Sequence, residues 1–270
     1  MNRGSAVKFE KVSKRFRTPK GTWYQALANL DFEVEAGQFV ALVGPTGCGK
    51  STALTLLAGL EQPSIGSVSV NGKEVQDIDT STGFVFQHDA TFPWMNVYNN
   101  IAAGPKFRKL KEHDALVKSW IAKVGLTGFE NNFPHQLSGG MKKRVALAQA
   151  LINEPSLLLM DEPFSALDVQ TRSIMTDELV ALWESTRSTV LFVTHDLEEA
   201  IALADRVIVL TAGPAQVKAD FTISLPRPRK ARDIRFTAEF LEIYHQIWNV
   251  LKDEVDIAYQ RQLVAPSGKK

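Results

Sequence analysis

Short apolar runs and amphipathic segments alternate along most of the chain. Residues 7–16 and 30–37 alternate apolar and polar positions, a pattern that predicts half-buried strands. Continuous apolar runs predict strands buried on both faces at residues 38–44, 156–163, 189–196 and 206–213. Helical patterns lie between the later runs, and this alternation predicts a mainly parallel sheet. The predicted fold class is therefore α/β, with an antiparallel β part near the N-terminus.

The middle of the chain has a different pattern. From about residue 97 to residue 153 the periodicity is helical, and no strand pattern interrupts it. We therefore predict a helical lobe, at about residues 89–153, inserted into one α/β domain that spans residues 1–225. Residues 226–270 are predicted to hold a basic segment and a last helix, without a separate regulatory domain.

The segment that follows residue 225 is rich in positive charge. A solvated linker is the favoured interpretation, because runs of charge usually face water, and an approach to anionic lipid is the alternative. Its basic residues are Arg227, Arg229, Lys230, Arg232 and Arg235.

Composition narrows the class of protein. The chain has 270 residues and a formal net charge of +1, whereas nucleic-acid binders usually carry a clear basic excess. Its single cysteine, Cys48, rules out a disulfide within the chain. No apolar stretch approaches the roughly 20 residues that cross a bilayer, so a soluble chain is expected, with any membrane contact made through a partner.

Residues 44–51 read GPTGCGKS and match the phosphate-loop pattern G-x-x-x-x-G-K-[ST] in full. A buried strand precedes the loop and a helix follows it, so backbone N–H groups and the helix N-terminus face the phosphates. Lys50 is expected to reach the β and γ phosphates, and Ser51 to bind Mg²⁺. Cys48 is expected to act through its backbone alone. The predicted nucleotide-binding residues here are Gly44, Pro45, Thr46, Gly47, Cys48, Gly49, Lys50, Ser51 and Thr52.

Two carboxylates follow the apolar run 156–160. A parallel strand would deliver Asp161 and Glu162 to the carboxyl edge of the sheet, where α/β proteins bind ligands. Asp161 is predicted to hold Mg²⁺, directly or through water, and Glu162 to activate the attacking water. A lysine, a metal ion and a base suffice as the core set for phosphoryl transfer.

Two more polar side chains end neighbouring strands. His195 follows the run 189–194, and a contact with the γ-phosphate is the favoured role, although a lone histidine at a strand end is often only a polar exit from the core. Gln87 ends the run 82–87 and is predicted to touch the metal ion or the water, at the boundary with the helical lobe. The predicted catalytic residues are Glu162, His195, Gln87 and Lys50, and the predicted metal ligands are Ser51, Gln87 and Asp161.

Together these motifs resemble the ATP-binding subunit of an ABC transporter over about residues 7–213. The phosphate loop, Gln87, LSGGMKKR at 137–144, LLLMDEP at 157–163, SALD at 165–168 and His195 occur in the family's order. The resemblance implies ATP hydrolysis with Mg²⁺ as cofactor, and a contact from Asp168 at the nucleotide interface. It also places Phe16 where the family stacks an aromatic ring on adenine, while a plain core phenylalanine remains an equal alternative.

LSGGMKKR raises the question of a second phosphate site. Its Ser138, Gly139 and Gly140 open a helix and offer free N–H groups and a hydroxyl, but neither a lysine nor a metal ligand accompanies them. A simple N-cap is the plainer alternative, although two glycines there weaken a helix. In the family, two ATPase subunits pack head to tail, and each ATP lies between one phosphate loop and the other chain's signature motif. The resemblance therefore implies a homodimer or a dimer with a close paralogue.

Residues 88–104 carry Phe92 and Trp94 on either side of Pro93. In the family this region forms the groove that receives a short helix of the membrane subunit, and packing inside the lobe is the alternative. The FPW pattern, the PTGCGKST loop and the LPRPR segment most resemble importers of nitrate, sulfonates, taurine or bicarbonate. The resemblance implies transmembrane permease subunits, an indirect solute-binding protein outside the cell, and a peripheral location on the cytoplasmic face of the membrane.

Other classes of ATPase fit less well. A chromosome or repair ATPase needs a long coiled coil between Lys50 and Ser138, and the interval shows no sustained heptads. A ribosome-associated factor usually carries two ATPase units in one chain, and a P-loop kinase does not need the LSGG motif. The ATPase subunit of an exporter is the alternative that the sequence opposes least.

Overall fold

The structure is a computed structural model that describes residues 4–87, 90–110, 112–165 and 167–264. The first residue of the predicted range 1–225, the last residue of the predicted range 226–270, and residue 89 at the predicted start of the lobe lie outside these residues. Its strands are β1 (Val7–Arg17), β2 (Trp23–Val34), β3 (Phe39–Val43), β4 (Ile65–Val70), β5 (Lys73–Glu74), β6 (Thr82–Val85), β7 (Leu157–Asp161), β8 (Thr189–Thr194), β9 (Arg206–Leu210) and β10 (Val217–Thr222). Its helices are α1 (Lys50–Leu57), α2 (Val97–Phe107), α3 (Asp114–Lys123), the 3₁₀ helix η1 (Pro134–Gln136), α4 (Gly139–Leu151), α5 (Val169–Thr186), α6 (Leu197–Leu203), α7 (Ala231–Ile234) and α8 (Ala238–Val264).

Within these described ranges, the strands form two sheets. The larger sheet has the order β10-β9-β3-β8-β7-β6, and all its pairs are parallel except β10 with β9. The smaller sheet, β2-β1-β4-β5, is antiparallel and closes with the predicted turn at Asn71 and Gly72, both at positive φ. The predicted α/β class, with an antiparallel N-terminal part, is confirmed.

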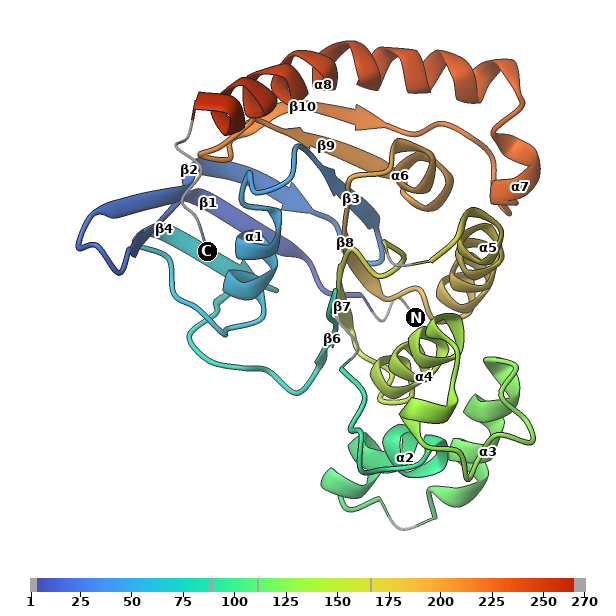
Figure 1. Ribbon diagram of the computed structural model, residues 1–270. Helices are drawn as coiled ribbons and strands as arrows, with labels where there is room; N and C mark the ends of the chain where they lie inside the picture. The colour runs from blue at the N-terminus through green and yellow to red at the C-terminus, as the bar shows by residue number, and fades with distance from the viewer. Residues whose placement is uncertain (1–3, 88–89, 111, 166, 265–270) are drawn as a thin grey trace.

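The two faces of the parallel sheet support different parts of the molecule. Alternate residues of β3 point to opposite faces, so Phe39 and Ala41 join one buried cluster while Val40 and Leu42 join the other. The first cluster includes apolar residues of α4, α5 and α6, and the second includes those of α1 and the antiparallel sheet. Helices α1 and α4 therefore pack on opposite faces of one sheet (Figure 1).

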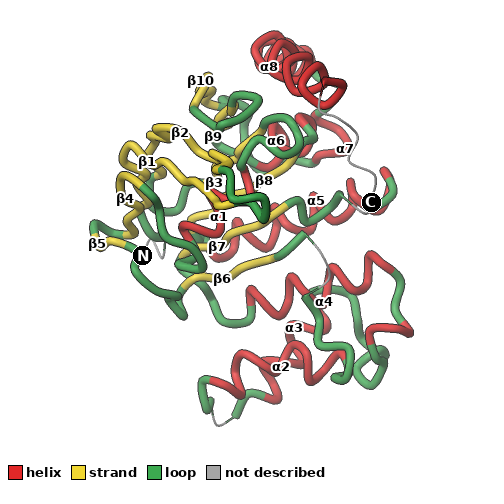
Figure 2. The backbone as a smooth tube through the Cα atoms, turned by 60° about the vertical axis from the view of Figure 1, so that its left-hand side comes forward, coloured by secondary structure: helices red, strands yellow, loops and turns green. Residues whose placement is uncertain are grey.

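Helices α2, α3 and α4 gather at one end of the molecule, away from the antiparallel sheet (Figure 2). Val97, Ile101, Val117, Trp120 and Ile121 are buried between these helices. This packing continues into the cluster that covers the parallel sheet, so the helical region and the sheet share one core. In the described part of the chain, no helix is long and apolar enough to span a bilayer.

The basic segment after residue 225 packs onto the domain. Arg227 donates to Asp205 Oδ1, and its guanidinium lies 4.4 Å from the centre of the Trp183 ring. Arg229 is only 4% exposed, and burial lowers the pKa of its guanidinium to about 10. The carbonyl acceptors of Arg229 belong to Ile201, Ala204, Ile223 and Leu225. The interpretation as a solvated linker is therefore wrong for Arg227 and Arg229, which satisfy carbonyls and a carboxylate of the domain, whereas Lys230 and Arg232 are exposed.

Candidate active site

The phosphate loop joins β3 to α1, as its pattern predicts. Gly47 and Gly49 have positive φ, and a Cβ on Gly49 would lie 2.6 Å from Ala26 O, so glycine is required there. The Cys48 side chain is buried in the cluster beneath the loop, and burial raises the pKa of its thiol. The side chain thus packs on the core side of the loop, and the side of the loop that faces away from the core presents backbone groups.

Lys50 is buried against its own loop. Its ammonium donates to Gly44 O at 2.7 Å and to Pro45 O at 3.0 Å. Neutral carbonyl oxygens do not compensate the positive charge of a buried ammonium, so an anion beside it would be strongly stabilised. The Lys50 ammonium lies close enough to the loop to donate instead to phosphate oxygens that the loop holds.

Two oxygen donors at the head of the loop suit a magnesium ion. The Ser51 hydroxyl donates to Asp161 Oδ1 at 3.0 Å, which brings the ends of α1 and β7 together. Burial raises the pKa of the Asp161 carboxyl, so its ionised form needs a compensating cation. Magnesium is usually held by one or two carboxylate or hydroxyl oxygens, with water and phosphate oxygens completing its shell. Ser51 and Asp161 therefore fit Mg²⁺.

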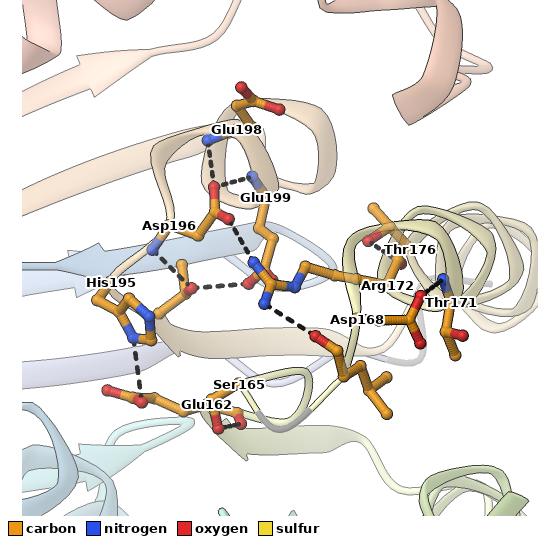
Figure 3. Close-up of polar contacts among 12 residues, drawn as sticks. Glu162, Ser165, Asp168, Thr171, Arg172, Thr176, His195, Asp196, Glu198 and Glu199 are labelled. Carbon is orange, nitrogen blue, oxygen red and sulfur yellow. Dashed lines mark hydrogen bonds and ion pairs between the residues drawn. The ribbon is translucent and has the colours of Figure 1, made fainter. Parts of the chain in front are cut away.

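Glu162 lies at the centre of the strand ends. Its Oε2 accepts from Gln87 Nε2 at 3.2 Å. The same oxygen lies 3.1 Å from His195 Nδ1 (Figure 3). The contact with His195 lowers the pKa of Glu162, and the same hydrogen bond raises the pKa of the imidazole. Side chains that follow β6 and β8 thus meet the carboxylate that follows β7, and this carboxylate is kept ionised at neutral pH, as a proton acceptor must be.

Behind this cluster lies a residue that the sequence did not single out. Arg172 of α5 donates to Leu167 O at 3.1 Å and to Asp196 Oδ2 at 2.9 Å, and its Nε lies 3.4 Å from Glu199 Oε1 (Figure 3). One planar guanidinium thereby joins the segment before α5 to the loop that carries His195. Only its place four residues after Asp168 in the sequence would have given a signal.

Glu199 is the buried member of this network. Its Oε2 accepts from the Thr194 hydroxyl at 2.7 Å. Burial raises the pKa of Glu199 to about 7, against the opposing effects of Thr194 and Arg172. Because Thr194 immediately precedes His195, the network fixes the end of β8 from behind.

Asp168 lies at the near edge of the same region as the N-cap of α5. Its carboxylate accepts from Gln170 N at 3.1 Å and Thr171 N at 3.0 Å, and these bonds lower its pKa. Of the four residues SALD, Ala166 lies outside the described residues. A contact of Asp168 with nucleotide remains a prediction.

The signature residues open α4, as predicted. Ser138 is the N-cap and accepts from Met141 N at 3.3 Å, while Ser138 and Gly139 are exposed. A Cβ on Gly140 would lie 3.1 Å from Thr171 Cγ2, so the start of α4 lies against the start of α5. The phosphate loop lies at the head of α1, on the other face of the sheet, and the chain does not bring the two motifs together.

The residues after these glycines anchor α4 to the domain. Met141 packs half-buried against the larger core cluster. The buried Lys143 donates to Gln87 O at 2.7 Å, and Arg144 pairs with Glu178 of α5 at 3.1 Å. The lysine thus ties the signature helix to the strand end that carries Gln87, whereas nothing in the structure explains Lys142.

Two aromatic residues are candidates for an adenine contact. Phe16 is half-buried on β1, packs against the smaller cluster, and has Lys14 Nζ 4.9 Å from its ring centre. Its cross-strand partner Tyr24 is largely exposed and donates from its hydroxyl to Gly47 O at 3.2 Å. Tyr24 therefore joins Phe16 as a candidate, which the sequence did not predict.

The fold and the strand-end chemistry define a P-loop ATPase. The family model described as ABC transporter matches residues 27–165. An uncharacterized ABC transporter ATP-binding protein of Methanocaldococcus jannaschii is 44% identical over 251 residues, covering 92% of each chain. The aliphatic sulfonates import ATP-binding protein SsuB of Bacillus cereus is 41% identical over 230 residues, covering 85% of this chain and 91% of its own.

Solved structures agree with these relatives. An ATP-binding cassette in a dimeric post-hydrolysis state with ADP and phosphate has a TM-score of 0.73 and 31% identity, covering 82% of this chain and all of its own. A dimeric bacterial ABC transporter cassette gives the same TM-score at 30% identity. The chain belongs to the ABC transporter family and is one of its ATP-binding, ATP-hydrolysing subunits.

Proposed function

We propose that this chain is the ATPase subunit of an importer for a small anionic solute, working as a head-to-tail dimer. One observation carries the proposal: the phosphate loop and the exposed Ser138–Gly139 motif belong to helices on opposite faces of one sheet. Neither the phosphate loop nor the signature motif encloses a nucleotide by itself. In a two-fold dimer, the signature motif of each chain would face the phosphate loop of the other. The dimeric state of the two similar cassettes supports this arrangement.

The proposed chemistry follows from the contacts at the strand ends. Ser51 and Asp161 would hold magnesium, which would supply positive charge beside the phosphates. Lys50 leaves its loop carbonyls for the β and γ phosphate oxygens, and Thr52 bonds the α phosphate. Glu162 takes the proton of the attacking water, and His195 holds the carboxylate and reaches the γ-phosphate. Gln87 stands between this site and the helical lobe, since its side chain touches Glu162 and its carbonyl accepts from Lys143.

The dimer is testable by size. Glu162→Gln keeps the loop and the metal ligands but removes the proton acceptor, so Mg-ATP should bind and remain. Light scattering should then show a dimer with Mg-ATP and a monomer without it. A variant that binds Mg-ATP, as measured by equilibrium dialysis, but stays monomeric would contradict the head-to-tail dimer.

A groove on the helical lobe supports a membrane partner. The groove has a volume of about 440 Å³, and its aromatic lining is formed by Phe84, Phe86, Phe92 and Phe107. The buried Asn100 holds its rim, accepting from Phe92 N and donating to Met95 O. An apolar groove of this kind suits a short amphipathic helix, and we assign it to the transmembrane subunits. The chain would then lie on the cytoplasmic face of the membrane and meet the solute-binding protein only indirectly.

The class of solute rests on the relatives. The Bacillus proteins named for aliphatic sulfonate import, at 41% and 42% identity, support a sulfonate importer. Taurine, nitrate and bicarbonate remain in the proposal on the resemblance of the sequence motifs alone. Uptake of each labelled anion should be compared between cells with the chain and cells with Glu162→Gln in its place. Loss of uptake of one anion would identify the solute, and unchanged uptake of all four would reject this class.

A further inference from the structure

A second groove opens beside the phosphate loop. Its volume is about 700 Å³, and its lining combines the loop edge Gly44–Thr46, the segment 195–199, the start of α5, α7 and one side of α8. Val169, at the start of α5, lies on its rim and is exposed. The groove is therefore continuous with the edge where ATP would bind, but it extends well beyond it.

Helix α8 presents two apolar stripes, of which only one is covered. Phe240, Ile247 and Leu251 are buried against the domain, where α8 contacts α6, β9 and β10. Tyr244, Trp248, Val255 and Tyr259 form a second stripe at helical spacing, which lines the groove. Tyr244 is half-buried against the larger core cluster, but Trp248 is 40% exposed and Tyr259 is 58% exposed, so the chain itself leaves most of this stripe uncovered.

The position of α8 is fixed relative to the phosphate loop. The buried Glu254 accepts from Ala212 N at 2.8 Å and pairs with Lys218 at 3.0 Å, and Arg261 donates to the carbonyls of Ala212 and Gly213. A Cβ on Gly213 would lie 3.5 Å from Cys48 Cα, which places this turn against the loop. These contacts hold α8 at a fixed place against the domain, beside β9 and β10 (Figure 1).

We propose that the groove and the second stripe of α8 are part of the interface with a second copy of this chain. The inference rests on the proposed dimer: a second chain that covers ATP at Gly44–Thr46 and His195 also covers the groove that shares those residues. In a two-fold dimer the same patch of both chains is buried, so each uncovered stripe adds apolar area twice. Helix α8 therefore stabilises the ATP-bound dimer without touching ATP.

The chain offers a matched pair of variants. Val255 lines the groove and is 37% exposed, whereas Ile257, two residues on, is 41% exposed and is not part of the lining. In the Glu162→Gln background with Mg-ATP, Val255→Glu should raise the dissociation constant of the dimer by about tenfold, as loss of a well-packed interface contact does. Ile257→Glu should change it by less than about twofold.

A second pair of variants and two control measurements complete the test. Tyr259→Arg should repeat the effect of Val255→Glu, and Leu241→Arg, at an exposed position of α8 outside the lining, should not. Thermal unfolding and Mg-ATP binding by the monomer should be unchanged in all four variants. Equal dimerisation of both members of a pair, or equal weakening of both, would overturn the role of the groove. A Glu162→Gln parent that never dimerises would instead reject the proposed function.

Discussion

The strand-end cluster and the signature turn both offer groups for phosphate, yet they differ in completeness. At the strand ends, three segments supply Lys50, the pair Asp161 and Glu162, and His195. Lys50 contacts its own loop, Asp161 accepts from Ser51, and Glu162 contacts His195. At the start of α4, Ser138 and Gly139 are exposed, and among the described residues the Ser138 hydroxyl bonds within its own helix turn. In the proposed function, the first region contains the catalytic groups, and the second supplies a surface for the nucleotide of the partner chain. One chain would then hold a complete set of catalytic groups and only half of the nucleotide enclosure.

The largest effect should come from the complete region. Glu162→Gln removes the acceptor of the water's proton, and hydrolysis should fall by at least about a hundredfold. Affinity for Mg-ATP should hold, because neither Ser51 nor Asp161 changes. Steady-state phosphate release and ATP binding measure the two effects separately. Loss of hydrolysis smaller than tenfold would remove Glu162 from the role of base.

The same substitution has a consequence for titration. The hydrogen bond from His195 to Glu162 raises the pKa of the imidazole, so the pKa of His195 should fall toward its usual value in Glu162→Gln. NMR titration of the imidazole in the nucleotide-free protein measures this shift. An unchanged pKa would mean that the two side chains do not pair in solution.

The incomplete region predicts rescue in trans. Chains with Lys50→Ala and chains with Ser138→Ala should each be nearly inactive. In an equal random mixture, about half of the dimers combine the two variants and have one intact site of two, so activity should recover to about a quarter. The measurement is phosphate release after mixing with Mg-ATP. Mixed dimers that form, as shown by differently tagged chains, without any recovery would contradict two half-sites.

A smaller effect should come from Arg172, which supports the strand-end cluster from α5. Arg172→Met removes the bonds to Leu167 O and Asp196, so the loop of His195 loses its support from α5. We expect kcat to fall by about tenfold with little change in KM, as displacement of a catalytic group does. Arg172→Lys keeps the charge but cannot form both bonds, so its kcat should lie between those of the wild-type chain and Arg172→Met. An equal effect of both variants on KM would point to a general loss of folding.

Sequence alone predicted the strand-end groups because each follows a strand whose apolar pattern is local. Gly44, Asp161 and His195 mark the ends of β3, β7 and β8, and parallel strands bring such ends to one edge. The polar contacts of α5, α6 and α8 could not be predicted in this way, because they join segments that are distant in the sequence. Arg172 and Glu254 look like ordinary charged positions on amphipathic helices, and only the tertiary fold gives them Asp196 and Ala212 as partners. The basic segment was misjudged for the same reason.

The smallest effect on turnover, and the clearest one on stability, should come from Glu199. Its carboxyl is held protonated up to pH about 7 in the folded state. Between the usual pKa of a glutamate and pH 7, the folded state holds a proton that the unfolded state has lost, so the stability from this group falls as pH rises. Glu199→Gln should remove this loss, which is of the order of 1–2 kcal/mol. Denaturant unfolding at pH 5 and pH 8 measures it.

Glu178 gives a control at the contact between α4 and α5. Burial also raises its pKa, but its side chain is more exposed than that of Glu199 and pairs with Arg144. Glu178→Gln should therefore alter the pH dependence of stability less than Glu199→Gln does, since water already solvates the Glu178 carboxylate. The order of the two effects separates the buried network behind His195 from the more exposed contact that anchors the signature helix. The reverse order would place the buried charge at the lobe contact and remove the distinction between the two regions.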